Sequence, residues 1–449
     1  MIHTKKRPIR RQAHRLLAGC MLAALPITSA GAAAVLETLI AQALEQNHGL
    51  HALNRQIDAA EATQREARAA YFPQMGASLQ YIATDNAPQA FMLQLNQRQL
   101  DMRDPAFDPN QPDDTTNLQM SLGVHMPLYH AARQPRQHAT RLQSALSRQN
   151  MAAARNALVH AVTQGYYQVL EAQAFAAVQQ AAQLSFTESL RVARERFESG
   201  AVVRTDVLNL EVQLAQANEN LIRARNGIQL AIAALNATIG MDTVSIEGLP
   251  EPDMHIPAPH SEPLSTAARP ELAAAHLQHK LASEQIRIAR AGTRPNLYLF
   301  GSVIWDGERL NEDREESYIA GVALDWNWFD GGRTRARTDA ARAMQDSARA
   351  SIQQTLTQLE LEAKQAYLHM QEAWQRIQVT EHASTSADEA LRITRALYQE
   401  GAADIATLLV AELALTETRM RATAARYDYL IALSNAKRTA GLFASISHH

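Results

Sequence analysis

Two pairs of histidines are spaced so that they could bind a metal ion. His276 and His279 are three residues apart and could share a helix face with Glu271 or Glu284, an arrangement that metal sites use. His48 and His51 repeat the spacing nearer the amino terminus. Such pairs are common on the polar faces of helices, so we interpret them as surface residues and predict no metal site.

No other group of residues indicates catalysis. Asp113 and Asp114 are adjacent acids in a segment rich in proline and aspartate, where exposure to solvent is the simpler interpretation. The sequence contains no Gly-Lys-Ser/Thr phosphate loop, no zinc signature and no nucleophile elbow. We therefore predict a protein that is not an enzyme and uses no cofactor.

The elements that position these residues are organised around a helix stop and restart that occurs twice. Helix-favouring residues end at Gly200 and resume at Thr205, and they end again at Gly401 and resume at Asp404. Glycine readily takes the left-handed conformation that closes a helix, and small polar or acidic residues cap the next one. Both stretches are predicted to be the turns of tight helical hairpins.

The chain is predicted to contain a tandem duplication. Gly200 and Gly401 are 201 positions apart, and Gly240 and Gly441 keep the same offset. The predicted parts are a first repeat over 35–240, a proline-rich linker over 241–268 and a second repeat over 269–443.

Each repeat is predicted to end in a long helical hairpin, over 131–240 in the first repeat and 332–440 in the second. The longer helix of each hairpin has around 60 residues and would span about 90 Å. No globular core can support helices of this length, so they require helical neighbours throughout, as in a coiled coil.

Two segments in each repeat alternate between apolar residues and small or polar residues, which is the period of a β-strand. The predicted strands are 74–82, 117–128, 296–305 and 317–328, with a loop over 85–115 between the first two. Strands of about ten residues with aromatic ends are typical of transmembrane barrels, whereas a soluble sandwich would bury the apolar face inside. Four strands cannot close a barrel, so the membrane interpretation requires oligomers, and three chains give twelve strands.

Residues 1–34 are predicted to be a cleaved signal peptide, because six basic residues are followed by an apolar stretch and then by small residues. The single cysteine, Cys20, follows Leu-Ala-Gly as in a lipoprotein cleavage box, but Arg15 leaves almost no apolar segment before it. Cleavage after Ala32 or Ala34 would leave a chain without cysteine, with 37 basic and 46 acidic residues. This negative charge argues against a nucleic-acid partner.

These features follow the same order in two copies, and together they resemble the TolC-like outer-membrane efflux proteins over about residues 35–443. The motifs that carry the resemblance are Phe197-Glu-Ser-Gly200, Tyr398-Gln-Glu-Gly401, Asp206-Val207-Leu208, Phe329-Asp-Gly-Gly332 and Phe91-Met-Leu-Gln-Leu-Asn-Gln97. The resemblance implies an α+β membrane protein of a Gram-negative cell. In it, a homotrimer forms a 12-stranded β-barrel in the outer membrane, continued by a coiled-coil barrel of long α-helices in the periplasm.

The resemblance also implies the function of a passive exit duct in a tripartite efflux pump or a type I secretion system. The implied partners are outer-membrane lipid, a periplasmic adaptor (membrane fusion protein) and an inner-membrane transporter of the RND or ABC class. One alternative is that the chain is itself a periplasmic coiled-coil adaptor, which would need a globular lipoyl-like segment. A second alternative is a secreted scaffold, which would have no use for amphipathic strands.

In this family the periplasmic end narrows where the hairpins converge, and polar contacts near the turns hold it. Asp206 matches the acidic position after the first turn, and Tyr398 matches the aromatic residue before the second glycine. We expect a hydrogen bond between these two residues to close the aperture. The alternative is that the helix dipole favours Asp206 in a first turn and that Tyr398 is a packing residue.

Some members of the family carry a basic residue two places after the second glycine and a ring of acids further on. Here the corresponding positions are Ala403, Thr407 and Val410, so neither a salt-bridge lock nor that charged constriction is predicted. Asp404 and Glu412 are the acids that could stand near the aperture instead.

Overall fold

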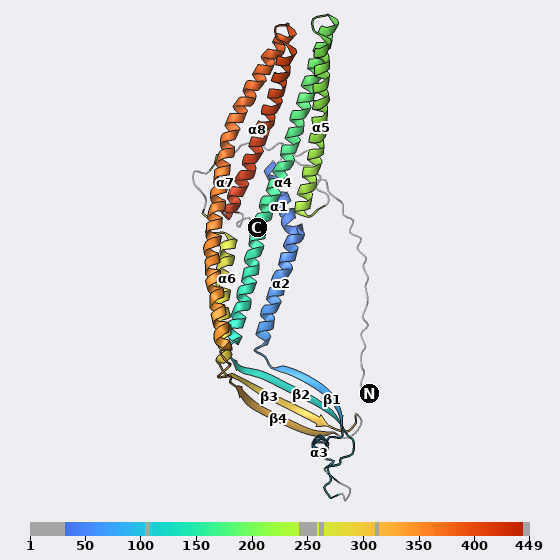
Figure 1. Cartoon of the computed structure of the whole chain (residues 1–449), viewed down its shortest axis with the longest axis vertical. Helices are drawn as coiled ribbons and strands as arrows, with labels where there is room; N and C mark the ends of the chain where they lie inside the picture. Colours follow the sequence, from blue (N-terminus) through green and yellow to red (C-terminus); the bar gives the residue numbers. More distant parts are fainter. Residues whose placement is uncertain are drawn as a thin grey trace, which may run out of the picture.

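The computed structural model describes residues 32–103, 108, 110–241, 258–259, 265–309 and 314–442. Cys20, nearly all of the predicted signal peptide and most of the predicted linker lie outside these residues. The molecule is elongated, with a β-sheet at one end and two helical hairpin turns at the other (Figure 1).

Both repeats follow the same order of helix, two strands and long hairpin. The first repeat contains α1 (Ala32–Gln46), α2 (His48–Ala69), β1 (Gln74–Thr84), α3 (Ala87–Asn96), β2 (Thr115–His130), α4 (Arg133–Glu198) and α5 (Arg204–Ile239). The second contains α6 (Pro270–Arg290), η1 (Ala291–Thr293), β3 (Asn296–Asp306), β4 (Glu315–Asp325), α7 (Arg333–Gln399) and α8 (Ile405–Thr439).

The four strands form one antiparallel sheet in the order β1-β2-β3-β4. Its register gathers the apolar residues of the alternating pattern on one face, with the pairs Leu79↔Met120, Leu122↔Val303 and Leu299↔Val322. The other face is more polar and includes a hydrogen bond of 2.8 Å between the hydroxyls of Ser78 and Ser121. β1 and β4 each have one edge without a partner strand in the described chain.

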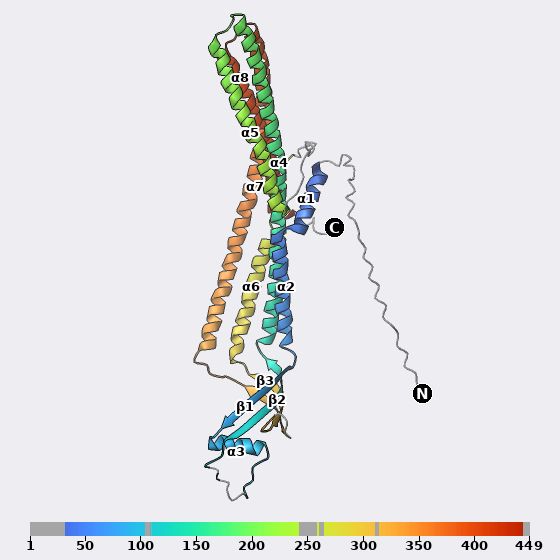
Figure 2. The same ribbon diagram turned by 90° about the vertical axis from the view of Figure 1, so that its right-hand side faces the viewer.

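Helices α2, α4, α6 and α7 lie side by side where they leave the sheet, and α5 and α8 complete the hairpins at the far end (Figures 1 and 2). Leu190, Leu210 and Leu408 belong to a buried cluster that joins the two hairpins near their turns. A second cluster, around Tyr166 and Leu235, packs α4 and α5 against α1. No helix in the described residues is both long and apolar enough to cross a membrane.

Equivalent contacts tie the short helices to the hairpins in the two repeats. Asn47 caps α2, and its Nδ2 donates to the carbonyl of Thr238 at the end of α5, at 2.9 Å. Arg269 precedes α6 and donates through Nη1 to the carbonyl of Thr439 at the end of α8, at 3.4 Å. Thr238 and Thr439 are 201 positions apart, the offset between the two turn glycines.

Two expectations from the sequence need correction. The segment 85–115 is not only a loop, because α3 forms within it. The Asn86 side chain accepts a hydrogen bond from the amide of Gln89, and a proline occupies the first turn, so a helix start is encoded locally. The strand expected over 317–328 ends at Asp325, since its partner β3 begins at Asn296 and offers no residue further on.

Candidate functional site: the hairpin turns

The two hairpin turns have the same backbone geometry. Gly200 has a φ of 77° and Gly401 a φ of 79°, in the left-handed region that favours glycine. The amide of Ala201 donates to the carbonyl of Arg196, and the amide of Ala402 donates to that of Leu397, each at 2.8 Å. Both turns are therefore closed helix ends of the kind that the sequence predicts.

Arg196 joins one hairpin to the other. It stands in the last turn of α4, and its Nη1 donates a hydrogen bond to the carbonyl of Tyr398 in the last turn of α7. Its guanidinium carbon also lies 4.9 Å from the centre of the Tyr398 ring, which adds a cation–π contact. Sequence reasoning missed this residue, because nothing in a single turn shows that it reaches the other hairpin.

Tyr398 is buried, with only 2% of its surface exposed. Its hydroxyl has no hydrogen-bond partner in the described part of the chain, so the bond to Asp206 that we expected is not formed. Burial, with a smaller contribution from the charge of Asp206, raises the pKa of Tyr398, while Arg196 opposes the shift. Asp206 therefore lies close enough to act on Tyr398 electrostatically without a hydrogen bond.

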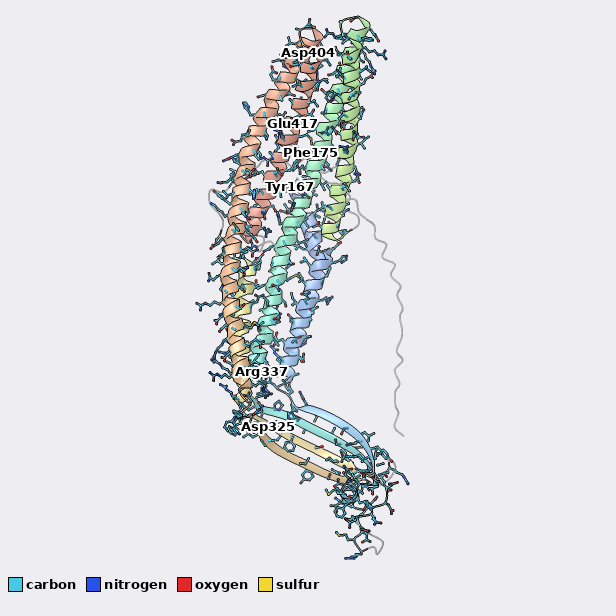
Figure 3. The ribbon with its side chains drawn as sticks, in the orientation of Figure 1. Tyr167, Phe175, Asp325, Arg337, Asp404 and Glu417 are labelled. Atoms are coloured by element: carbon cyan, nitrogen blue, oxygen red, sulfur yellow. The ribbon has the colours of Figure 1, made fainter. Side chains whose placement is uncertain are left out.

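Asp404 immediately precedes α8 and caps its first turn (Figure 3). Its carboxylate accepts a hydrogen bond from the amide of Thr407 at 2.8 Å. The side chain and backbone of Thr407 lower the pKa of Asp404, so the carboxylate stays charged. The acid that we expected near the turn therefore stabilises the start of α8. Val410, one turn further along α8, is 67% exposed.

Glu412 does not supply acidity to an aperture, because it is buried with 2% of its surface exposed. Arg395 on α7 donates to its carboxylate at 2.7 Å. The hydroxyls of Ser185 and Ser189 on α4 donate to the same carboxylate at 2.5 and 3.0 Å. A buried charge thus fastens α8 to α7 and to the other hairpin, and the Arg395 Nε has no partner among the described residues.

The same ion pair occurs in the first repeat. Arg194 donates to Glu211 at 2.7 Å, and each residue stands 201 positions before its counterpart in the Arg395–Glu412 pair. The first pair is exposed, with side-chain exposures of 57% and 42%. The 201-residue offset is the sequence signal for this contact, but it does not show that the acid is buried only in the second pair.

The histidine pairs do not assemble a metal site. His276 is exposed on α6, and His48 and His51 are exposed on α2. The two acids that could have joined His276 and His279 are paired with arginines: Glu271 with Arg269 at 2.8 Å and Glu284 with Arg287 at 3.1 Å. Among the described residues there is no group of three or more histidines, cysteines or acids that could hold a metal ion.

A family model described as outer membrane efflux protein matches residues 39–241 and 264–441. The chain belongs to the outer membrane efflux protein family. Among curated relatives, it is 26% identical to the alkaline protease secretion protein AprF of Pseudomonas aeruginosa, over 72% of this chain and 69% of AprF. It is 27% identical to the outer membrane protein OprJ of the same species, over 82% of this chain and 76% of OprJ.

Solved structures share the fold. The outer membrane protein VceC of Vibrio cholerae matches with a TM-score of 0.76 and 20% identity, over 91% of this chain and 96% of VceC. The likeness confirms the predicted fold of long helices with four antiparallel strands per chain.

Membership of this family confirms several predictions. The chain is an outer-membrane efflux channel of a Gram-negative bacterium and not an enzyme. Members of the family form trimers and work with inner-membrane transporters. The alternatives of a periplasmic adaptor or a secreted scaffold are therefore set aside.

Proposed function

We propose that this channel is the exit duct of a three-part assembly, with a periplasmic adaptor and an inner-membrane transporter of the RND or ABC class. The observation that carries the proposal is the sheet, whose continuous apolar face and two unpaired edges run directly into helices that end at the distant hairpin turns. One end offers a surface to lipid and to neighbouring protomers. The other end is free to meet a partner in the periplasm. The division into repeats over 35–240 and 269–443 is part of this proposal.

The closed end of the duct is proposed to lie at the turns, where Asp206, Tyr398, Asp404, Thr407 and Val410 are the candidate aperture residues. The contacts at this level support the assignment, because they join the hairpin of α4 and α5 to the hairpin of α7 and α8. Opening requires hairpins to separate, so contacts between them oppose it. The conductance of Asp206→Ala and Val410→Ala channels tests which candidates face the aperture.

A groove of about 450 Å³ near the turns is the proposed contact site for the adaptor. It is lined by α4, α7 and α8 and includes Arg392, Gln399 and the ion pair of Arg419 with Asp388 at 2.6 Å. Polar and charged linings suit a contact that must form and dissociate in water. A single cysteine at Gln399→Cys, linked by a bifunctional reagent in whole cells, should capture a protein that mass spectrometry identifies as the adaptor. A cysteine at Met75→Cys on the sheet should not.

Three kinds of cargo fit a duct of this shape: small molecules, metal ions and polypeptides. The relative named for alkaline protease secretion supports the polypeptide. Deleting the gene in its own host tests all three, by comparing secreted proteins in the medium, the accumulation of ethidium in the cells and the sensitivity of the cells to metal salts. We expect one of the three to change and the cloned chain to restore it. If none changes, the proposed assembly is wrong.

A further inference from the structure

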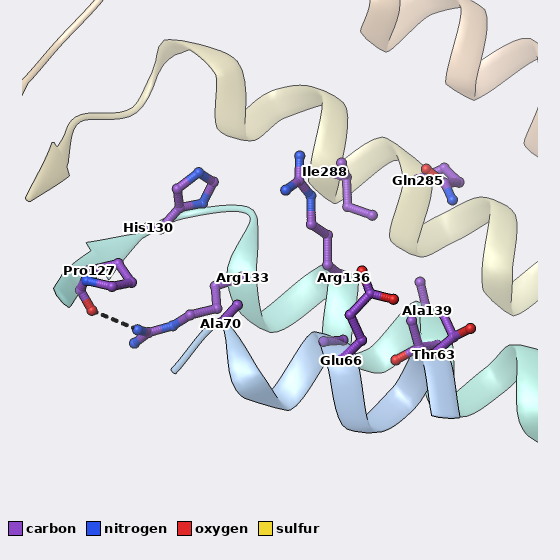
Figure 4. Close-up of a pocket in the computed structure, with 12 residues that line it drawn as sticks. Thr63, Glu66, Ala70, Pro127, His130, Arg133, Arg136, Ala139, Gln285 and Ile288 are labelled. Atoms are coloured by element: carbon purple, nitrogen blue, oxygen red, sulfur yellow. Dashed lines mark hydrogen bonds between the residues drawn. The ribbon is translucent and has the colours of Figure 1, made fainter. Parts of the chain in front are cut away.

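A pocket of about 540 Å³ lies where the sheet meets the helices (Figure 4). It is formed over α4 between α2 and α6, with the end of β2 at one side. Its lining includes Glu66, Pro127, His130, Arg133, Arg136 and Ile288, together with several alanines. It is far along α4 from the turns, so the closure of the duct does not account for it.

The register of the sheet shows on which face of the sheet the pocket residues Pro127 and His130 lie. Pro127 pairs with Tyr298, and His130 pairs with Asn296 after a bulge. Tyr298 and Asn296 are two residues apart on β3, so their partners lie on one face. That is the polar face, which carries His125. In a barrel whose apolar face meets lipid, the polar face lines the channel, and the pocket opens toward its interior.

The pocket combines positive charge with an apolar lining. Arg133 is held in place, since its Nη1 donates to the carbonyl of Pro127 at 3.0 Å and its guanidinium lies 4.0 Å from the centre of the Tyr71 ring. Arg136 is exposed, and no salt bridge to it is found among the described residues. Glu66 is the one acid in the lining.

His130 contributes no charge in this geometry, because its Nδ1 accepts a hydrogen bond from the amide of Ala132 at 3.2 Å. The charged groups of the lining are therefore two guanidinium groups and one carboxylate, which leaves an excess of positive charge. Alanines, a proline and Ile288 supply the apolar surface beside them.

We propose that this pocket binds anionic amphiphilic molecules inside the channel, with Arg133 and Arg136 holding the acidic group and the alanines and Ile288 contacting the apolar part. Guanidinium groups bind carboxylate, sulfonate and phosphate oxygens through charge-assisted hydrogen bonds. Three chains place three such pockets at the level where the barrel passes into the helical part. The inference rests on the proposed function as a duct, because the pocket needs a cargo that passes it.

The test uses the purified trimer in planar lipid bilayers, with naphthalenesulfonate as the anionic probe and naphthyltrimethylammonium as its cationic counterpart. We expect the anion, and not the cation, to block the current. In Arg133→Gln/Arg136→Gln channels the half-blocking concentration of the anion should rise about tenfold, the loss expected for removing charged hydrogen bonds. Arg136→Gln alone, an exposed change that should fold normally, should give part of this rise.

Two further variants make the test specific to the pocket. Glu66→Gln removes the acid and should shift the half-blocking concentration in the opposite direction, to a lower value. Arg141→Gln is the matched control, since it makes the same change on α4 roughly 140° around the helix from Arg136, where the side chain lines a different groove. It should leave the block unchanged.

Equal block of wild-type and double-variant channels by the anion would overturn the site while leaving the duct in place. Equal block by the cation and the anion would overturn it as well. A wild-type trimer that carries no current would contradict the duct itself and with it this inference, so the two failures are distinguishable.

Discussion

Arg196 in the last turn of α4 donates a hydrogen bond to the backbone carbonyl of Tyr398 in the last turn of α7, and its guanidinium lies over the Tyr398 ring. A side chain of one hairpin thus binds a residue immediately before the turn of the other. We expect the two turns to move as one unit as long as this contact holds. Loss of the contact is expected to let the hairpins move apart.

The Tyr398 hydroxyl should contribute nothing to stability, because it is buried without a partner in the described chain. We expect Tyr398→Phe to be neutral or to stabilise by up to about 1 kcal/mol, since it removes an unsatisfied polar group. Tyr398→Ala should cost about 3–5 kcal/mol, because it leaves a cavity. Thermal unfolding of the trimer, followed by circular dichroism, measures both. Equal losses in the two variants would show that the hydroxyl has a partner in the trimer.

The two turn glycines allow a matched comparison. Both have positive φ, so alanine at either position should cost about 1–2 kcal/mol in backbone strain. A Cβ at Gly200 would meet nothing within 4 Å, whereas a Cβ at Gly401 would lie 3.1 Å from Nη2 of Arg196. Single-channel conductance should therefore rise in Gly401→Ala and not in Gly200→Ala. A rise of equal size in both would assign the effect to the strained turn and not to Arg196.

The two repeat-equivalent ion pairs should differ in energy. Glu412→Gln should destabilise by about 1–3 kcal/mol, because it removes the buried partner of Arg395, whose own side chain is 36% exposed and stays partly hydrated. Glu211→Gln makes the same change in the exposed pair and should cost about 0–1 kcal/mol. Unfolding temperatures of the two variants give the comparison. Equal losses of unfolding temperature in the two variants would show that burial of Glu412 does not strengthen its ion pair.

Glu171 predicts a pH dependence of stability. Burial, followed by the charge of Asp428, raises the pKa of Glu171 from 4.5 to about 7. Between these values the folded chain binds more protons than the unfolded chain, so the free energy of unfolding falls as the pH rises through this window. Glu171→Gln cannot ionise and should unfold at a higher temperature than the wild type at pH 8, with a smaller difference at pH 4. Glu219→Gln on the exposed side of α5 should show no such pattern.

Local rules predict the hairpin turns and the four strands, apart from the end of β4, because their signals are short-range. Gly200 and Gly401 need positive φ, and the alternation of the strands needs only a period of two. The helix α3 was missed because its segment is rich in proline and aspartate, although Asn86 and the proline after it are signals of a helix start. The end of β4 at Asp325 depends on where β3 begins, which the β4 sequence alone does not show.

Local rules of this kind do not predict the contacts between the two hairpins. Tyr398 and Asp206 were identified by position, but the partner of Tyr398 is Arg196, which comes from a helix 202 positions away. The sequence suggests that Glu412 stands near the aperture, because its sequence neighbours do not show that Ser185 and Ser189 lie against it. Which charged residue is buried depends on the packing of α4 on α8, a property of the folded chain.

We propose that contacts between the hairpins keep the end of the duct closed. Single-channel conductance of the purified trimer in planar bilayers tests it most directly, comparing wild type with Arg196→Ala and with Arg223→Ala, a matched change whose ion pair stays within α5. We expect a small wild-type conductance that rises clearly in Arg196→Ala and stays the same in Arg223→Ala. Channels of equal conductance in all three would contradict it.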